Sequence, residues 1–194
     1  MQSISQKVLS TIEIQKSKFV CILIPLNKLE DVKIELENIK KEYKCATHYC
    51  YGYIFDQMKR FSDDGEPGGT AGMPILKVLE NHSFNHVLAV VVRYFGGIKL
   101  GAGGLVRAYT NSVVDAIEKC EKINLIVGIK LKISFSYNQE KNIQNILSPY
   151  PILEKDYQEE ISYTLFLPQN YLENLKNYSY QILEENVLGE EKKA

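Results

Sequence analysis

Residues 87–109, with the sequence VLAVVVRYFGGIKLGAGGLVRAY, carry the strongest structural signal in the chain. They open with six consecutive apolar residues, Val87 to Val92, and such a run predicts a strand buried on both faces. Five glycines follow within nine residues, from Gly96 to Gly104. After them, apolar residues recur at helical spacing at Leu105, Tyr109, Val113, Ala116, Ile117 and Cys120. The pattern predicts a buried strand, a glycine-rich turn and an amphipathic helix.

This order of elements brings the free N–H groups of a helix N-terminus to the turn, where an anion can bind. The cations Arg93, Lys99 and Arg107 flank the turn. The alternative interpretation is structural, because glycine also serves tight turns and close packing. Neither standard nucleotide-binding fingerprint is present, since Val106 stands where the dinucleotide motif needs Gly or Ala. The turn is therefore a candidate anion site of no standard nucleotide-binding type.

Composition limits the class of protein. The 194 residues, 45% of them hydrophobic, suit one large domain or two small ones with a real core. The net charge of −1 gives no global attraction to nucleic acid or membrane, so either contact would need a local patch. The four cysteines form no C-x-x-C pair, which favours reduced thiols in a cytoplasm. No apolar run is long enough to span a bilayer, so we expect a cytoplasmic protein without a membrane partner.

The first part of the chain predicts a mixture of strands and helices. Strands are expected at residues 8–14 and 18–24, and a helix through Leu29, Val32, Leu36, Ile39 and Tyr43. Residues 47–55 form a strand with aromatic residues on one face. Residues 62–72 are too rich in turn formers for regular structure, and a helix starts near Gly72 with Ile75, Leu76 and Leu79 on its buried side.

The second part of the chain has a different pattern. Strands are expected at 125–135, 152–157, 161–167 and 181–187, and helices at 138–147 and from Asn170 through Tyr178, before a charged tail at 190–194. The order β-α-β-β-α-β is that of a ferredoxin-like domain. The charge changes sign as well, because residues 1–122 carry 16 Lys+Arg against 14 Asp+Glu and residues 123–194 carry 7 against 10. We therefore expect two domains joined near residues 121–128.

Two groups of residues raise the question of catalysis or metal binding. The carboxylates Asp63, Asp64 and Glu66 could hold a divalent cation or act as acid and base, or they could accept bonds from loop N–H groups. The C-x-x-H-x-C sequence from Cys45 to Cys50 lacks the two clear ligand pairs of a zinc site, as does the spacing of His82 and His86. The candidate nucleophiles are Ser62, Thr70, Cys45 and Cys50 with His48, and no catalytic sequence motif surrounds them. We expect no catalytic residue, no metal and no cofactor.

Four motifs in this order resemble the YigZ/IMPACT family: KSKF at 16–19, ATHYCY at 46–51, DDGEPGGTAG at 63–72 and VVRYFGGIKLGAGGL at 91–105. The resemblance covers about residues 1–120. It implies an α+β protein whose domain 1–122 has a fold like the second domain of ribosomal protein S5, including a left-handed crossover. The second domain, 123–194, is similar to the ferredoxin-like domain of bacterial YigZ proteins and to the last domain of elongation factor G. Tyr49 and Gly52 depart from the residues that relatives often carry, Asn and Ala.

The resemblance also implies a link to translation, because eukaryotic members regulate the starvation response of initiation. For bacterial members the usual proposal is binding of RNA or the ribosome. We therefore expect a non-enzymatic regulator whose basic, glycine-rich site binds RNA. The residues expected to contact nucleic acid are Lys16, Lys18, Arg60, Arg93, Lys99, Gly101, Gly103, Gly104 and Arg107. A ligand loop is expected at His48, Asp63, Asp64, Glu66, Gly68, Gly69 and Thr70.

Two other interpretations stay open. The chain could be a protein-interaction module for a ribosome-associated translation factor, or a hydrolase that uses the region of Asp63, Asp64 and His48. Nothing in the sequence predicts the oligomeric state.

Overall fold

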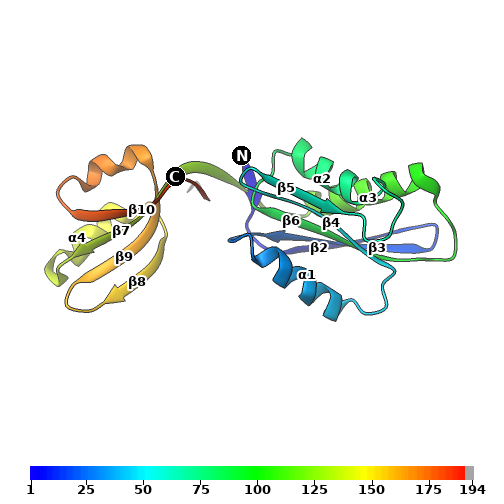
Figure 1. The fold of residues 1–194 in the computed structure, drawn as a ribbon. Coiled ribbons are helices and arrows are strands. Elements are labelled where there is room, and N and C mark those ends of the chain that lie inside the picture. The colour runs from blue at the N-terminus through cyan, green and yellow to red at the C-terminus, as the bar shows by residue number, and fades with distance from the viewer. Residues whose placement is uncertain (191–194) are drawn as a thin grey trace. The chain divides into compact units, whose positions relative to one another are not determined.

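A computed structural model describes residues 1–190 of the chain (Figure 1). The chain divides into two compact units, Met1–Ile123 and Asn124–Ala194. Both contain strands and helices, which confirms the α+β class. None of the described helices is both long and apolar enough to cross a membrane.

The first unit contains a five-stranded sheet in which every neighbouring pair is antiparallel. Its strands are β2 (Val8–Ile14), β3 (Ser17–Pro25), β4 (His48–Phe55), β5 (Met58–Ser62) and β6 (Val87–Tyr94). A short β1 (Gln2–Ile4) precedes them in the chain and lies outside this sheet. The order across the sheet is β2-β3-β6-β4-β5, so β6 is central. Residues 87–92 are fully buried, as the apolar run predicts.

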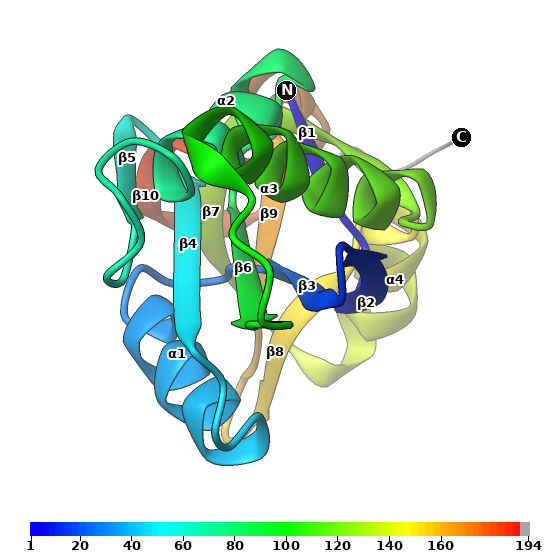
Figure 2. The ribbon, with the colours of Figure 1, turned by 90° about the vertical axis from the view of Figure 1, so that its right-hand side faces the viewer.

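Helices cover both faces of this sheet, which is why β6 is buried on both sides. Helix α1 (Asp31–Glu42) packs on one face, and α2 (Gly72–Asn81) and α3 (Gly101–Glu118) pack on the other (Figures 1 and 2). The aromatic face of β4 lies toward α1. The predicted buried residues of α2 and the helical stripe from Leu105 to Ile117 face the opposite core.

Two predictions for this unit were wrong. Helix α3 begins at Gly101 and not near Leu105, so Gly101, Gly103 and Gly104 lie in its first turn. Glycine is a poor helix former, and the apolar stripe that marks the helix begins only where the chain reaches the core. Strand β5 was missed because its five residues, MKRFS, are largely exposed and show no apolar alternation.

The second unit is an antiparallel sheet in the order β10-β7-β9-β8. Its elements are β7 (Lys122–Phe135), the 3₁₀ turn η1 (Tyr137–Gln139), α4 (Glu140–Leu147), β8 (Ile152–Tyr157), β9 (Ile161–Pro168), the 3₁₀ helix η2 (Gln169–Leu175) and β10 (Ser179–Glu190). The expected α-helix at Asn170 is this 3₁₀ helix, without a side-chain cap. A capping box is found instead at Ser136 and Gln139. Of the predicted charged tail, residues 191–194 lie outside the described residues.

The ring of Phe166 on β9 packs over two glycines on neighbouring strands of this sheet. The buried Phe166 of β9 lies against Gly128 of β7 and Gly189 of β10, where an added Cβ would meet ring atoms at 2.6 Å in both cases. The ring thus covers backbone that the two glycines leave bare.

Candidate functional site

The loop between β5 and α2 is folded by the carboxylate of Asp63. Its Oδ1 accepts hydrogen bonds from the N–H groups of Ala71 and Gly72 at 3.0 and 2.8 Å, and its Oδ2 accepts one from Gly69 at 2.8 Å. The side chain therefore satisfies free N–H groups at the start of α2. Thr70 closes the same loop through its hydroxyl, which donates to the Pro67 carbonyl at 2.7 Å. For Asp63 the structure therefore supports the interpretation that its carboxylate accepts hydrogen bonds from loop N–H groups.

Asp64 and His48 join this loop to the start of β4. Oδ2 of Asp64 accepts the Tyr49 N–H at 2.7 Å, and Nδ1 of His48 lies 2.8 Å from the Asp64 carbonyl oxygen. Because a carbonyl only accepts, Nδ1 must carry the hydrogen, and a neutral His48 has its lone pair on Nε2. That nitrogen lies 3.9 Å from Oε2 of Glu66.

Glu66 is the buried centre of the arrangement. Its Oε1 accepts a hydrogen bond from Nη1 of Arg93 at 2.5 Å and another from the Tyr109 hydroxyl at 2.8 Å. Both charged side chains are almost completely buried, with 4% of Glu66 and 6% of Arg93 exposed. The guanidinium also lies over the rings of Phe19 and Phe95, at 5.3 and 5.5 Å from their centroids. Its Nε is buried without a hydrogen-bond partner.

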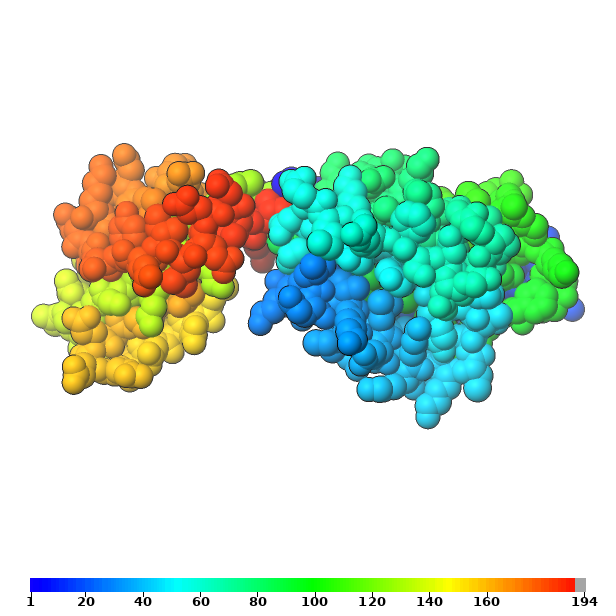
Figure 3. All heavy atoms as spheres, viewed as in Figure 1, coloured from blue at the N-terminus to red at the C-terminus, as the bar shows by residue number. Residues whose placement is uncertain are grey.

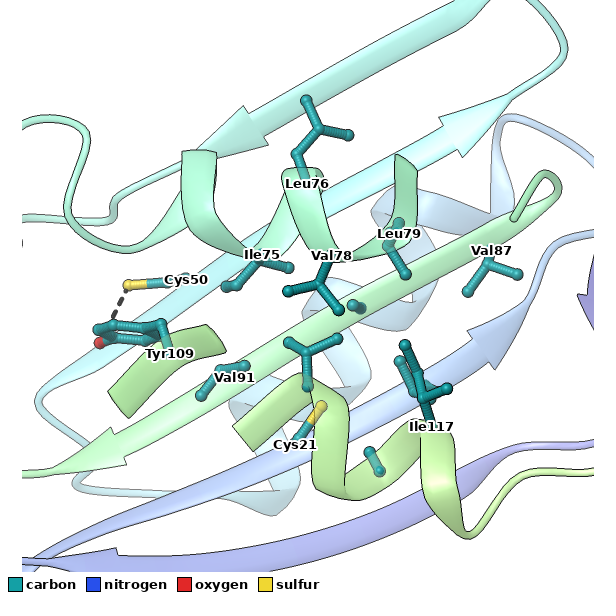
Figure 4. Close-up of a cluster of buried hydrophobic side chains, with 14 of the residues drawn as sticks. Cys21, Cys50, Ile75, Leu76, Val78, Leu79, Val87, Val91, Tyr109 and Ile117 are labelled. Atoms are coloured by element: carbon teal, nitrogen blue, oxygen red, sulfur yellow. Dashed lines mark hydrogen bonds between the residues drawn. The ribbon is translucent and has the colours of Figure 1, made fainter. Parts of the chain in front are cut away.

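Cys50 extends this network into the apolar core. Its thiol lies 3.3 Å from the Tyr109 hydroxyl (Figure 4). It also lies 3.0 Å from the Asp63 carbonyl oxygen. Burial raises the pKa of Cys50 to about 12 and also raises the pKa of Tyr109 well above its ordinary value. Both groups therefore stay protonated at neutral pH, and Cys50 is not an activated nucleophile.

A second contact joins the β2–β3 hairpin to the loop between β6 and α3. Gln15 and Lys16 have positive φ angles, as a two-residue hairpin turn requires. Gly96 packs so closely on this turn that an added Cβ would lie 2.0 Å from the Lys16 carbonyl atoms. Its N–H donates to the Ser17 hydroxyl at 3.2 Å, and the Phe95 N–H donates to the Thr47 hydroxyl at 3.0 Å. Residues of all four sequence motifs therefore meet in this part of the first unit.

Helix α3 begins at Gly101, five residues after Gly96 in the chain. No side chain caps the helix, its first turn holds no acidic residue, and Gly101 and Gly103 are exposed. The guanidinium of Arg107 reaches back along this turn, with Nη1 4.0 Å from the position of a Cβ at Gly103. Lys99 is exposed just before the helix. The first N–H groups of α3, which have no partner within the helix, thus lie beside cations.

The predicted nucleic-acid residues do not all belong to this region. Arg93 is buried in its ion pair with Glu66, so its charge is already neutralised and faces away from solvent. Arg60 lies on β5, and the strands β6 and β4 separate it from Lys18 on β3. The pairing register also displaces Arg60 by six residues along the strands relative to Lys18. At about 3.3 Å per residue, that is roughly 20 Å along the strands. Lys18 alternates with Phe19 along β3 and therefore lies on the face of the sheet that α1 covers, opposite α3. The structure thus separates Lys18, Arg60 and Arg93 from Lys16, Lys99 and Arg107.

Tyr109 falls on the apolar stripe of a helix in the sequence, and that pattern does not indicate its polar role. A tyrosine on a buried stripe does indicate a polar partner nearby, because its hydroxyl needs a hydrogen bond when it is buried. His82 and His86 do not share a helical turn, because His82 ends α2 and His86 lies beyond it, paired with Asp56. Gly68 and Gly69 of the expected ligand loop are exposed, and open space surrounds both.

Comparison with known proteins identifies the family. The sequence model of the Impact N-terminal domain matches residues 15–117. The chain belongs to the IMPACT family. It is 36% identical over 163 residues to the IMPACT family member YvyE of Bacillus subtilis (strain 168), covering 81% of this chain and 75% of that protein. It is 38% identical over 168 residues to an IMPACT family member of Haemophilus influenzae, covering 83% and 82%.

A solved structure extends the similarity to most of the chain. The crystal structure of a hypothetical protein, 32% identical, matches with a TM-score of 0.66 and covers 94% of this chain and 95% of that chain. The resemblance that the four motifs suggested is therefore confirmed at the level of the family.

Proposed function

We propose that this protein is a non-enzymatic, cytoplasmic regulator of translation that binds RNA, free or within the ribosome. The contact surface, here called the α3 surface, comprises Lys16, Lys99, Arg107 and the first turn of α3 with Gly101, Gly103 and Gly104. The observation that carries the proposal is the uncapped start of α3, whose free N–H groups lie beside Arg107 and Lys99. Such an arrangement suits a phosphate.

The surroundings of the α3 surface suit RNA better than a small anion. Phe95 and Ile98 lie in the same loop as Lys99 and are 47% and 42% exposed. An exposed aromatic ring beside cations allows a base to stack while phosphates are neutralised. Membership of the IMPACT family supports the link to translation, which the motif resemblance implies for relatives.

The hydrolase interpretation gains no support from the geometry. Three backbone N–H groups already occupy the Asp63 carboxylate, and the Cys50 thiol is held protonated. Within the described residues, no cluster of three or more His, Cys, Asp or Glu side chains could hold a metal ion. Binding of a ribosome-associated protein instead of RNA is the alternative that the experiment below distinguishes.

Removing three cations of the α3 surface should weaken RNA binding. We expect the variant Lys16→Ala/Lys99→Ala/Arg107→Ala to bind 20-nucleotide single-stranded RNAs of two unrelated sequences at least tenfold more weakly. The loss should be equal for both RNAs because phosphates carry no sequence information. The log–log salt dependence should fall by roughly 0.7 per lost contact, or about 2 in all. Fluorescence anisotropy at several salt concentrations measures both quantities.

The matched control is Lys28→Ala/Lys41→Ala/Arg60→Ala, which removes the same charge at positions away from the α3 surface. It should retain the affinity and the salt dependence of the original protein. Equal weakening of both triple variants would mean that binding responds to net charge alone. A folded α3-surface variant with unchanged affinity would exclude RNA from this surface and favour the protein-partner alternative.

We also propose that the two units are separate domains. The first, residues 1–122, would have the fold of the second domain of ribosomal protein S5, and the second, residues 123–194, a ferredoxin-like fold. The strand order β10-β7-β9-β8 supports the latter. Lys122 is exposed near the boundary, so limited trypsin digestion should cut there early and release two folded fragments. Fragments that show no cooperative thermal transition by circular dichroism would contradict the division.

A further inference from the structure

A groove lies on the face of the first sheet that α1 covers, opposite the face that packs against α3. Its volume is about 390 Å³. The lining residues come from α1 and the segment before it, Leu29, Val32, Lys33, Leu36, Glu37 and Lys40, and from β4, Tyr51 and Tyr53. The two tyrosine rings are nearly parallel, with centroids 6.4 Å apart. Figure 3 shows α1 in blue on the same side of this unit as the cyan β4–β5 segment.

The groove lies next to a strand with a free edge. β5 is the last strand of the sheet, four of its five residues are exposed, and no described strand pairs with its outer edge. Cross-strand partners share a face, so Arg60, opposite Tyr53, and Met58, opposite Phe55, lie on the groove side of β5. The Tyr53 hydroxyl contacts the Met58 sulfur at 3.6 Å. The apolar surface of the groove therefore continues to the edge of the sheet.

The charges around this surface are mainly positive. Among the lining residues, Lys33 and Lys40 are cations and Glu37 is the one carboxylate, and Arg60 adds a further cation on the groove side of β5. Lys59, the neighbour of Arg60, lies on the opposite face and is paired with Glu80 at 2.9 Å. An incoming chain that carries carboxylates would thus meet complementary charge on the groove side of β5.

From these observations we propose that β5 accepts an extended, acidic segment of a partner protein as a sixth strand, with an apolar side chain seated in the groove. The exposed edge supplies the backbone N–H and C=O groups that such a strand pairs with. A peptide fits better than nucleic acid, because the lining is largely aliphatic and aromatic and the Tyr53 hydroxyl already has a partner. The surface is separate from the α3 surface, so one protein could hold RNA and a protein partner together.

Designed peptides test the proposal on the full-length chain. The probe is a fluorescein-labelled twelve-residue peptide that alternates glutamate with valine and has one central glutamate replaced by phenylalanine, so that this phenylalanine and the remaining glutamates share one face of the strand. Its counterpart has lysine for every glutamate. We expect the acidic peptide to bind with a Kd below about 100 μM and the basic one at least tenfold more weakly. Hydrogen exchange should show new protection of the β5 amides in the complex.

Two substitutions on β5 give a matched comparison. Arg60→Gln should weaken binding of the acidic peptide at least fivefold, and Lys59→Gln, which removes the same charge from the opposite face, should change it less than twofold. The α3-surface variant Lys16→Ala/Lys99→Ala/Arg107→Ala should bind the peptide normally, so failure of one proposal is distinguishable from failure of the other. No binding of either peptide at 1 mM, equal binding of both, equal effects of the two β5 variants, or displacement of the peptide by a 20-nucleotide RNA would each overturn the inference.

Discussion

Replacement of Arg93 by methionine should lower the free energy of unfolding by about 3–5 kcal/mol, because it leaves the Glu66 carboxylate buried without its cation. Small domains are stable by only about 5–15 kcal/mol, so the variant should be close to unfolding at physiological temperature. Urea denaturation at 25 °C measures the change, provided that the slope of the transition stays the same.

The double variant Arg93→Met/Glu66→Met identifies the cause of this loss. Removing both charges avoids the uncompensated carboxylate, and the variant should therefore be more stable than Arg93→Met alone. Part of the loss should persist, because the Tyr109 hydroxyl no longer has its acceptor. A single Arg93→Met substitution that costs less than about 1 kcal/mol would show that the pair is not a buried structural contact. Folded Arg93→Met protein should also keep its RNA affinity, since Arg93 lies outside the α3 surface.

Gly96→Ala should lower the free energy of unfolding nearly as much as Arg93→Met, although it adds only one methyl group. The new Cβ would lie 2.0 Å from the Lys16 backbone, which cannot move aside as a flexible side chain could. We expect a loss of about 3 kcal/mol, at the upper end for overpacking. The hairpin that carries Lys16 should also shift away from α3, so RNA affinity should fall. Thermal unfolding and the anisotropy assay measure the two effects.

The control is Gly68→Ala, which makes the same chemical change where a Cβ meets no atom within 4 Å. Its backbone φ does not require glycine, so its stability should stay within about 0.5 kcal/mol of the original protein. Similar stabilities of the two variants would mean that the hairpin does not pack on Gly96 as closely as the structure shows.

Periodicity predicted the elements that the core organises. The run at residues 87–92 identified the central strand, and the stripe from Leu105 to Ile117 identified the buried face of α3, because both patterns record contact with the core. Elements with less core contact were harder to find. β5 is exposed on the sheet edge, and the first turn of α3 carries glycines whose composition suggests a loop.

The candidate site shows the same limit for side chains. Glu66 and Arg93 are separated by 27 positions in sequence, and nothing local indicates that their charges cancel inside the fold. Arg93 is one of the cations that flank the turn in the sequence, yet its position in the central strand buries it. Arg60 was grouped with the same cations because it is basic, and only the strand order places it elsewhere. The sequence shows which residues are charged, but the strand order and register determine which charged side chains lie close together.

The ring of Phe166 also constrains how the second unit can vary in evolution. At Gly189 an added Cβ meets only this ring among its nearest neighbours, so a smaller residue at 166 would make room for a larger one at 189. At Gly128 the Cβ would also lie 2.3 Å from the Leu167 carbonyl oxygen, which no substitution removes. Among relatives, positions 166 and 189 should therefore change together, while position 128 should remain glycine.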